Sequence, residues 1–397
     1  MSNIGRQLPS EMTTYVDEKT GIKVTKLTSK GTNKHLYFTE NSFYSDDKSI
    51  LCIRTEGTLK DRGATEMYKL DLESGILTQL TDFASEGLVP TGFNKSADGS
   101  ILTAILDGDL YALSPVTGER RLLVKCPAGF QLGQCSFSYD NRYIAIGANE
   151  ILPESKRQVN GHENYNGFRE AFYNYKRSKL IIATVDGSWC ETVYNDTHWL
   201  GHVQFAPDTN EYISYCHEGP WNFVQQRIWL FNTVRRSVEP CYRQIERDSV
   251  GHEFWTRDGL VFYDNRGRGH DGTITSDKTQ AVTVDYNGPD DIPEVGFVNK
   301  DGEIVRKLEL PYYCNHYHAN IDNTLLVADA VNDLVLIDIS TDTPKIRSLC
   351  VHDTSWRWQQ CHPHPTFSWS NDAILFASDK DNEGEVHLYL VRMKDVK

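Results

Sequence analysis

The sequence lacks any apolar run near the roughly 20 residues that a membrane-spanning helix needs. Its first residues, Met1 to Arg6, contain no apolar core of the kind that secretory signals carry. The nine cysteines are scattered and form no C-x-x-C pair, so neither a zinc knuckle nor a disulfide framework is indicated. Together these absences predict a cytoplasmic protein with no membrane partner.

Positive charge is also in short supply. The chain has 41 Lys and Arg residues against 55 Asp and Glu residues, which gives a formal net charge of −14. A general nucleic-acid binder would carry a basic stripe, so we expect no nucleic-acid partner. A small anionic substrate remains compatible with this charge, because the local field in a cleft decides whether such a ligand binds.

Long amphipathic helices are missing as well, and a short β motif repeats instead. Each copy has an aromatic residue (alanine in one copy), a few polar residues, an aspartate and a short apolar strand. The seven copies begin at Phe43, Phe93, Phe137, Phe205, Phe254, Ala319 and Phe367. Most continue into a strand, turn and strand, as in Met67–Leu77. We therefore predict an all-β fold, a seven-bladed β-propeller with four-stranded antiparallel blades around a central channel.

The predicted propeller occupies residues 1–397 as a single domain, and a strand at about 23–28 is expected to close the last blade. Two repeats carry inserts, at about 151–178 and 264–290. Long loops on a rigid scaffold often carry function, although idle insertions are also tolerated in such places. The roles of both inserts stay open.

Histidine is abundant and unevenly placed. Of 13 histidines, ten lie between His198 and His364. Several occupy similar positions in successive repeats, close to the start of the motif or at the end of its first strand. Equivalent positions of a propeller face the same channel, so we expect these imidazoles to converge although they are far apart in sequence.

The segment Gln359-Gln360-Cys361-His362-Pro363-His364-Pro365 suggests a metal clamp. In an extended segment, residues two apart point the same way, and the prolines stiffen the chain. With His316 from the preceding repeat, the predicted ligands are His316, Gln359, His362 and His364, a mixed set that suits manganese, iron, zinc or nickel. Cys361 should face the opposite way. Solvated histidines in an ordinary loop are the alternative.

Arg227 follows the strand that ends near His217 and could pair with a ligand carboxylate through two hydrogen bonds. An arginine on a surface strand is the alternative.

Six segments together resemble the oligogalacturonate lyases, which are bacterial seven-bladed propeller enzymes of pectin degradation. The segments are Trp199–His202, Cys216–Pro220, Gly251–Trp255, Cys314–His316, His352–Trp356 and Gln359–Pro365. The resemblance covers nearly the whole chain. It differs after Asp322, where this chain is short, and after Tyr263, where it carries a glycine-rich insert.

The resemblance implies a manganese-dependent β-elimination on short anionic oligogalacturonides. For the assembly we expect a monomer or a homodimer. It implies that His316, Gln359, His362 and His364 hold the metal. It also implies that His252 is the base, that Arg227 contacts the substrate carboxylate or the developing oxyanion, and that His217 and His202 line the site. A metal and an arginine can stabilise the enediolate while a neutral histidine takes the C5 proton. No paired carboxylates are needed, unlike in glycoside hydrolysis.

Two other functions remain open from the sequence. One is a non-catalytic, metal-binding propeller that acts as a scaffold or sensor, because the fold alone does not determine function. The other is a lyase that acts on a different uronide, since the inserts border the predicted channel. A propeller peptidase is disfavoured because the chain has no G-x-S-x-G motif.

Overall fold

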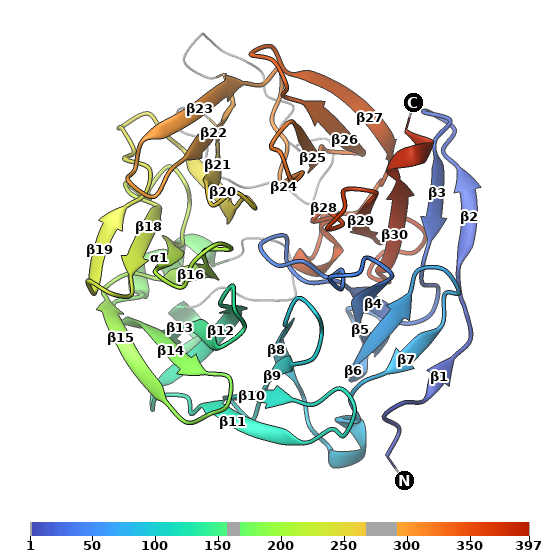
Figure 1. Cartoon of the computed structure of the whole chain (residues 1–397), viewed down its shortest axis with the longest axis horizontal. Helices are drawn as coiled ribbons and strands as arrows, with labels where there is room; N and C mark the ends of the chain where they lie inside the picture. Colours follow the sequence, from blue (N-terminus) through green and yellow to red (C-terminus); the bar gives the residue numbers. More distant parts are fainter. Residues whose placement is uncertain (1, 157–166, 267–291, 397) are drawn as a thin grey trace.

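The computed structural model describes residues 2–156, 167–266 and 292–396, and these residues form seven antiparallel sheets arranged in a ring (Figure 1). The first sheet contains β1 (Gln7–Leu8), β4 (Thr32–Lys34), β5 (Ser49–Gly57), β6 (Arg62–Asp71) and β7 (Leu77–Gln79). The second contains β8 (Thr91–Lys95), β9 (Leu102–Leu106), β10 (Asp109–Leu113) and β11 (Arg120–Val124). The third contains β12 (Phe130–Phe137), β13 (Tyr143–Glu150), β14 (Ser178–Thr184) and β15 (Cys190–Asp196).

The other four sheets follow in chain order around the ring. The fourth contains β16 (Leu200–Phe205), β17 (Tyr212–His217), β18 (Ile228–Asn232) and β19 (Ser237–Pro240). The fifth contains β20 (Val250–Trp255), β21 (Val261–Asn265), β22 (Glu294–Val298) and β23 (Ile304–Glu309). The sixth contains β24 (Tyr317–Ala319), β25 (Leu325–Asp329), β26 (Asp333–Asp338) and β27 (Lys345–Val351). The seventh contains β28 (Thr366–Phe367), β29 (Ala373–Ser378), β30 (His387–Arg392), β3 (Lys23–Lys26) and β2 (Thr13–Val16).

This architecture confirms the predicted seven-bladed β-propeller. It differs in one detail, because the first and seventh blades have five strands instead of four. The extra strands, β1 and β2, come from the N-terminal segment and add to the outer edges of these two sheets (Figure 1).

Helical structure is sparse in the described part of the chain. It consists of α1 (Phe168–Asn174) and the 3-10 turns η1 (Ala84–Glu86), η2 (Glu154–Lys156), η3 (Gln359–Cys361) and η4 (Met393–Asp395). No helix among the described residues has the length and apolar character needed to cross a membrane. The predicted insert at 151–178 contains η2 and α1, with residues 157–166 outside the described part. Most of the insert at 264–290 also lies outside it.

The aspartate of the repeat closes the turn between the first two strands of a blade. In the third blade, Ser138 donates its hydroxyl hydrogen to Asp140 Oδ1 at 2.8 Å, and the backbone N–H of Tyr143 donates to Ser138 Oγ at 3.0 Å. The fifth blade repeats this arrangement with Thr256 and Asp258, whose oxygens lie 2.5 Å apart. Local side-chain hydrogen bonds of this kind stabilise tight turns. The repeated motif therefore marks the same turn in successive blades.

A buried apolar cluster fills each interface between neighbouring sheets. Between the sixth and seventh sheets, for example, Val327 and Leu334 pack with Phe367 and Tyr389. Each sheet therefore buries both faces against its neighbours, which a blade cannot do alone.

The N-terminal segment joins the two ends of the ring. Strand β3 pairs with β30, with Val24 opposite Val391, and the chain then continues directly into β4 of the first sheet. Val24 is completely buried in the cluster between the sixth and seventh sheets. Both termini consequently lie at the outer rim (Figure 1).

The innermost strand of each sheet borders the central channel, and four of these strands contain a β-bulge at the same level. The bulges fall at Gly92-Phe93 in β8, Gly133-Gln134 in β12, His202-Val203 in β16 and His252-Glu253 in β20. A bulge adds one residue and redirects the neighbouring side chains. It is therefore a device for aiming selected side chains at the channel.

We predict that Val24→Ala lowers the free energy of unfolding by about 2 kcal/mol, because it removes buried methyl groups where the ring closes. The matched control is Val16→Ala in β2, where the side chain is 61% exposed. The control should change the stability by less than about 0.5 kcal/mol. Chemical denaturation measures both values, and equal effects of the two substitutions would contradict the assigned role of β3.

Candidate functional site

Four histidines from three successive blades meet in the channel. The ring centroids of His316 and His364 are 4.1 Å apart, those of His252 and His316 are 4.4 Å apart, and those of His362 and His364 are 5.6 Å apart. His252 lies on β20, His316 precedes β24, and His362 and His364 precede β28. His202 on β16 approaches the same group through Tyr37, with ring centroids 5.4 Å apart. The structure thus brings together five of the histidines that the sequence singled out.

Three of these side chains have a geometry suited to a metal ion. One ring nitrogen from each of His316, His362 and His364 lies within 4.8 Å of the others, and all three residues are buried. Burial lowers the pKa of His362 to about 3 and lowers the pKa values of His316 and His364 well below their usual range. The rings are therefore neutral at physiological pH, as ligation requires. His364 Nε2 is buried and has no hydrogen-bond partner among the described residues.

Asp329, at the end of β25, orients this group. Its Oδ1 accepts a hydrogen bond from the backbone N–H of His316 at 2.5 Å, and its Oδ2 lies 2.9 Å from His316 Nδ1. Contact of Nδ1 with a carboxylate leaves Nε2 of the same ring for a metal, which is a common arrangement around protein metal sites. Burial raises the pKa of Asp329 well above its usual range, while the backbone N–H groups of His316 and His364 act in the opposite direction.

The segment that carries two of the histidines is not a regular extended strand, which corrects the prediction. Residues Gln359–Cys361 form the 3-10 turn η3, and His364 has a φ of 43°. This left-handed conformation costs an L-residue roughly 1–3 kcal/mol. The two imidazoles therefore converge through a turn and a strained residue rather than through strand periodicity. Cys361 does face away, into the apolar cluster that contains Trp358 and Leu59.

Three glutamines, Gln134, Gln359 and Gln360, border the cavity of about 200 Å³ that His362 and His364 also line. Gln359, the predicted ligand, is exposed. Gln360 is partly buried, and its Oε1 is buried without a hydrogen-bond partner in the part of the chain described. Either Gln359 or Gln360 could therefore supply an amide oxygen to this cavity.

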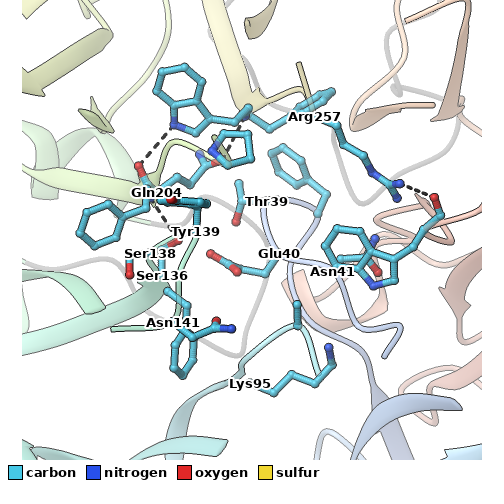
Figure 2. A pocket seen from close by; sticks show the side chains of 18 of the residues that line it. Thr39, Glu40, Asn41, Lys95, Ser136, Ser138, Tyr139, Asn141, Gln204 and Arg257 are labelled. Carbon is cyan, nitrogen blue, oxygen red and sulfur yellow. Dashed lines mark hydrogen bonds between the residues drawn. The ribbon is translucent and has the colours of Figure 1, made fainter. Parts of the chain in front are cut away.

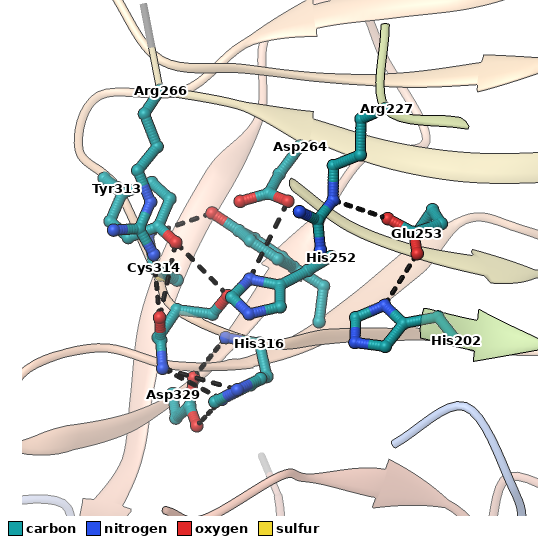
Figure 3. A network of polar contacts seen from close by, with 12 residues as sticks. His202, Arg227, His252, Glu253, Asp264, Arg266, Tyr313, Cys314, His316 and Asp329 are labelled. Atoms are coloured by element: carbon teal, nitrogen blue, oxygen red, sulfur yellow. Dashed lines mark hydrogen bonds and ion pairs between the residues drawn. The ribbon is translucent and has the colours of Figure 1, made fainter. Parts of the chain in front are cut away.

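His252 is held in a strained and almost fully buried position. It occupies the bulge of β20 with a φ of 34°, and its ring packs edge-on against Trp221 and Phe38. Its Nδ1 lies 3.9 Å from Asp264 Oδ1 (Figure 3). Burial lowers the pKa of His252 well below its usual range, and the positive charges of Arg266 and Arg227 act in the same direction. His252 is therefore a neutral imidazole that can accept a proton.

Arg227 is buried between two carboxylates, so it is not a surface-strand arginine. Its Nε donates to Glu253 Oε2 at 3.1 Å, and its Nη1 donates to Glu218 Oε1 at 3.3 Å. Glu253 also contacts His202 Nδ1 at 2.6 Å (Figure 3). His202 and Arg227 counteract the effect of burial and hold the pKa of Glu253 at about 2, so this carboxylate is ionised.

A second arginine lies beside the cluster. The Arg266 guanidinium stacks on Tyr313 and Trp221, with its central carbon 3.3 Å and 4.2 Å from the two ring centroids. Its Nη2 donates to Asn315 Oδ1 at 2.7 Å. Two cationic side chains therefore flank the four imidazoles, which favours an anionic ligand in spite of the negative net charge.

The loop after β4 provides the floor of the site. Phe38 is buried and its ring packs within 5.4 Å of His316 and 5.6 Å of His252, measured between centroids. Tyr37 packs against His364 at 4.8 Å. The loop reaches into the centre of the ring (Figure 1). Contacts with these two aromatic rings restrict the positions of the imidazoles.

His217, predicted to line the site, lies apart from this cluster. Its Nε2 is 2.9 Å from Asp196 Oδ2 and its ring stacks on His198, with centroids 4.2 Å apart. Its remaining ring contacts are with Tyr215 and Trp229. The end of the second strand of a blade thus does not face the channel in the same way as the bulge of the first strand.

Several residues of the site escaped the sequence analysis. Glu253 and Glu218 directly follow predicted site histidines, so adjacency was an available signal for both. Asp264 and Asp329 each lie at or next to the end of a second strand of a blade, and this shared position could have identified them. Tyr37 and Phe38 offered no signal, because nothing in the sequence places their loop in the channel.

Comparisons with known proteins identify the family of the chain. The profile of the oligogalacturonate lyase family matches residues 2–396. An oligogalacturonide lyase of Pectobacterium atrosepticum is 26% identical, and an oligogalacturonate lyase of Dickeya dadantii is 25% identical, each with 98% of both chains covered.

Solved structures show the same relationship. An oligogalacturonate lyase in complex with manganese superposes with a TM-score of 0.81 at 25% identity, with 100% of both chains covered. The oligogalacturonate lyase of Vibrio parahaemolyticus gives a TM-score of 0.78 at 25% identity, with 98% of both chains covered. With a family match over essentially the whole sequence, the chain belongs to the oligogalacturonate lyase family.

Proposed function

We propose that this site catalyses a manganese-assisted β-elimination on short oligogalacturonides, as part of pectin degradation. The observation that carries the proposal is the neutral imidazole of His252 packed directly against a three-histidine metal site, with Arg227 and Arg266 alongside. A proton acceptor, a candidate cation site and two arginines in one buried cluster match what removal of a proton next to a carboxylate requires.

The donor set fits a divalent ion of the manganese type. His316, His362 and His364 supply three neutral nitrogens, and the amide oxygen of Gln359 would supply the fourth ligand once its exposed side chain turns inward. No thiolate is included, because Cys361 packs away from the cavity. Mixed nitrogen and oxygen ligation suits manganese. A structural relative is a complex with manganese, which supports the same choice.

When bound, the metal would act as a Lewis acid on the C6 carboxylate of the uronate and so make the C5 proton more acidic. His252 would accept that proton as the base. The electron pair left at C5 would form the C4–C5 double bond as the C4–O4 bond breaks. The O4 oxygen would leave with the electron pair of that bond and take up a proton. The nearby Asp264 would stabilise the protonated imidazole through Nδ1, which leaves Nε2 for the substrate.

Arg227 would contact the substrate carboxylate or the developing oxyanion. Its contacts with Glu253 and Glu218 use Nε and Nη1, so Nη2 is the group that can reach the substrate. The same two carboxylates hold the guanidinium in place. Such preorganisation lowers the cost of orienting the positive charge during the reaction.

The arrangement of these residues does not favour the alternative function, a non-catalytic scaffold. A structural metal site would not need a neutral histidine held at a φ of 34° beside the ligands. A lyase for a different oligouronide would use the same groups, and the choice of substrate in the first experiment separates these two functions.

We expect chelation of divalent metal to abolish cleavage of digalacturonate, and manganese to restore it. The product is an unsaturated uronate, so its ultraviolet absorbance measures the reaction, while titration calorimetry measures manganese binding separately. His364→Ala should lose both signals. Full activity after chelation would contradict the metal role, and metal binding without cleavage of any oligouronide would support the scaffold.

Replacing His252 with alanine should lower kcat by about 10²–10⁴-fold, because the proton acceptor is lost. Manganese affinity should remain within about threefold of the original value, a change of under 1 kcal/mol. His198→Ala is the control for kcat, because the His198 side chain is 54% exposed and contacts Asp196 and His217 rather than the cluster. A nearly unchanged kcat for His252→Ala would rule out its assignment as the base.

Substitution of the two glutamines separates the predicted ligand from its neighbour. We expect Gln359→Ala to weaken manganese binding by at least about tenfold, or 1.4 kcal/mol, and Gln360→Ala to change it much less. Calorimetric titration with manganese measures both. The reverse pattern would assign the amide ligand to Gln360, whose oxygen is already buried.

A further inference from the structure

A second cavity, of about 290 Å³, opens at the other end of the channel (Figure 2). The same inner strands border both ends. His316, directly before β24, belongs to the histidine cluster, whereas His318 on β24, two residues later, lines the second cavity. Along β20, His252 is followed by Phe254 and Trp255, which also line it. The metal site and this cavity are therefore stacked along one channel.

The loop after β4 separates the two spaces. Tyr37 lines the cavity beside the metal ligands, whereas Thr39, Glu40 and Asn41 line the second cavity. Phe38 lies between them, because it contacts His252 and His316 and also borders the second cavity. The second cavity is consequently a separate space that the proposed β-elimination does not use.

Aromatic rings form much of the wall of the second cavity. Trp255 donates its indole N–H to the backbone oxygen of Gln204 at 3.3 Å, and Trp369 donates its own to the backbone oxygen of Phe43 at 3.0 Å. Both indoles are thus fixed in position. Rings held in this way present rigid apolar surface at a small cost in conformational entropy.

Hydrogen-bond donors and hydrogen-bond acceptors both project into the second cavity. Glu40 points into the cavity, close to Ser136, and Thr39 lies beside it (Figure 2). Burial raises the pKa of Glu40 to about 7, so the carboxyl group can donate as well as accept a hydrogen bond near neutral pH. His318 Nδ1 accepts a hydrogen bond from the backbone N–H of Phe367 at 3.2 Å, so its proton is on Nε2 as a donor.

The two cations of the cavity are directed at backbone carbonyl groups. Lys95 Nζ donates to the backbone oxygen of Phe43 at 2.7 Å. Arg257 donates from Nη2 to the backbone oxygen of Ser368 at 3.0 Å and from Nη1 to that of Trp369. A ligand carboxylate would gain little from groups that are already engaged, and it would lie near the Glu40 carboxyl group.

We propose that this cavity is a second binding site, for a neutral monosaccharide. A sugar hydroxyl group both donates and accepts hydrogen bonds, as Glu40, His318 and the hydroxyl groups of the cavity can reciprocate. The apolar face of a pyranose ring can pack on the fixed indoles. The cavity has the size and the mixed lining of a small-ligand site. The metal site, with its two arginines, instead suits an anionic sugar.

Calorimetric titration of the full chain with D-galactose, D-glucose and D-xylose tests the proposal, with D-galacturonate as the charged counterpart. We expect saturable binding of at least one neutral sugar, with a dissociation constant of about 1 mM or tighter. Binding should persist after chelation of metal and in His364→Ala, because the metal site is not involved. Absence of saturable binding for all three neutral sugars would overturn the proposal. Equally tight, metal-independent binding of galacturonate would also overturn it.

Substitutions locate the site. Glu40→Leu should weaken binding of the neutral sugar by at least about tenfold, which corresponds to 1.4 kcal/mol, because the carboxyl group that donates and accepts hydrogen bonds is lost. Thr39→Val offers a second, nearly isosteric test if Glu40→Leu does not fold. The matched control is Glu73→Leu in an exposed turn, which should not alter the affinity. Unchanged binding in the folded variants at positions 39 and 40 would exclude this cavity.

Discussion

The site depends on keeping several imidazoles in contact while they are all uncharged. Protonation of one ring would place a positive charge beside His316, His364 and the two arginines in a space with almost no solvent. Burial lowers the pKa values of His252, His316 and His364 far enough to prevent this. The same burial that makes the cluster electrostatically acceptable also makes it reactive, because neutral imidazoles are both metal ligands and proton acceptors.

In the propeller, the histidines and the acids beside them come from different strands of the same blade. The innermost strand supplies the histidine, either from its bulge or from the segment before it. The second strand carries, at or next to its last residue, an acid that lies beside this histidine. His252 is matched in this way with Asp264, and His316 with Asp329. His202 instead shares Glu253 with Arg227. The positive φ values of His202 and His252 store strain that the packing of the ring must offset.

Much of the fold could be predicted because its repeat has a local cause. The aspartate of each copy closes a turn through hydrogen bonds within a few residues, so the signal survives in the linear sequence. The convergence of His316, His362 and His364 followed from their equivalent positions in the repeats. The acids were missed because their partners are set by strand pairing. Tyr37 and Phe38 were missed because their loop enters the channel through tertiary packing alone. His217 looked equivalent to the others but ends a different strand of its blade.

The loop that carries Phe38 also sets the inner boundary of the proposed active site. Phe38 packs against His252 and His316 and also borders the second cavity, so the loop lies between the two spaces. In the proposed reaction, an oligomer bound at His252 would meet Phe38 as the inner wall of its site. Such a wall would favour short chains over movement along a long polymer.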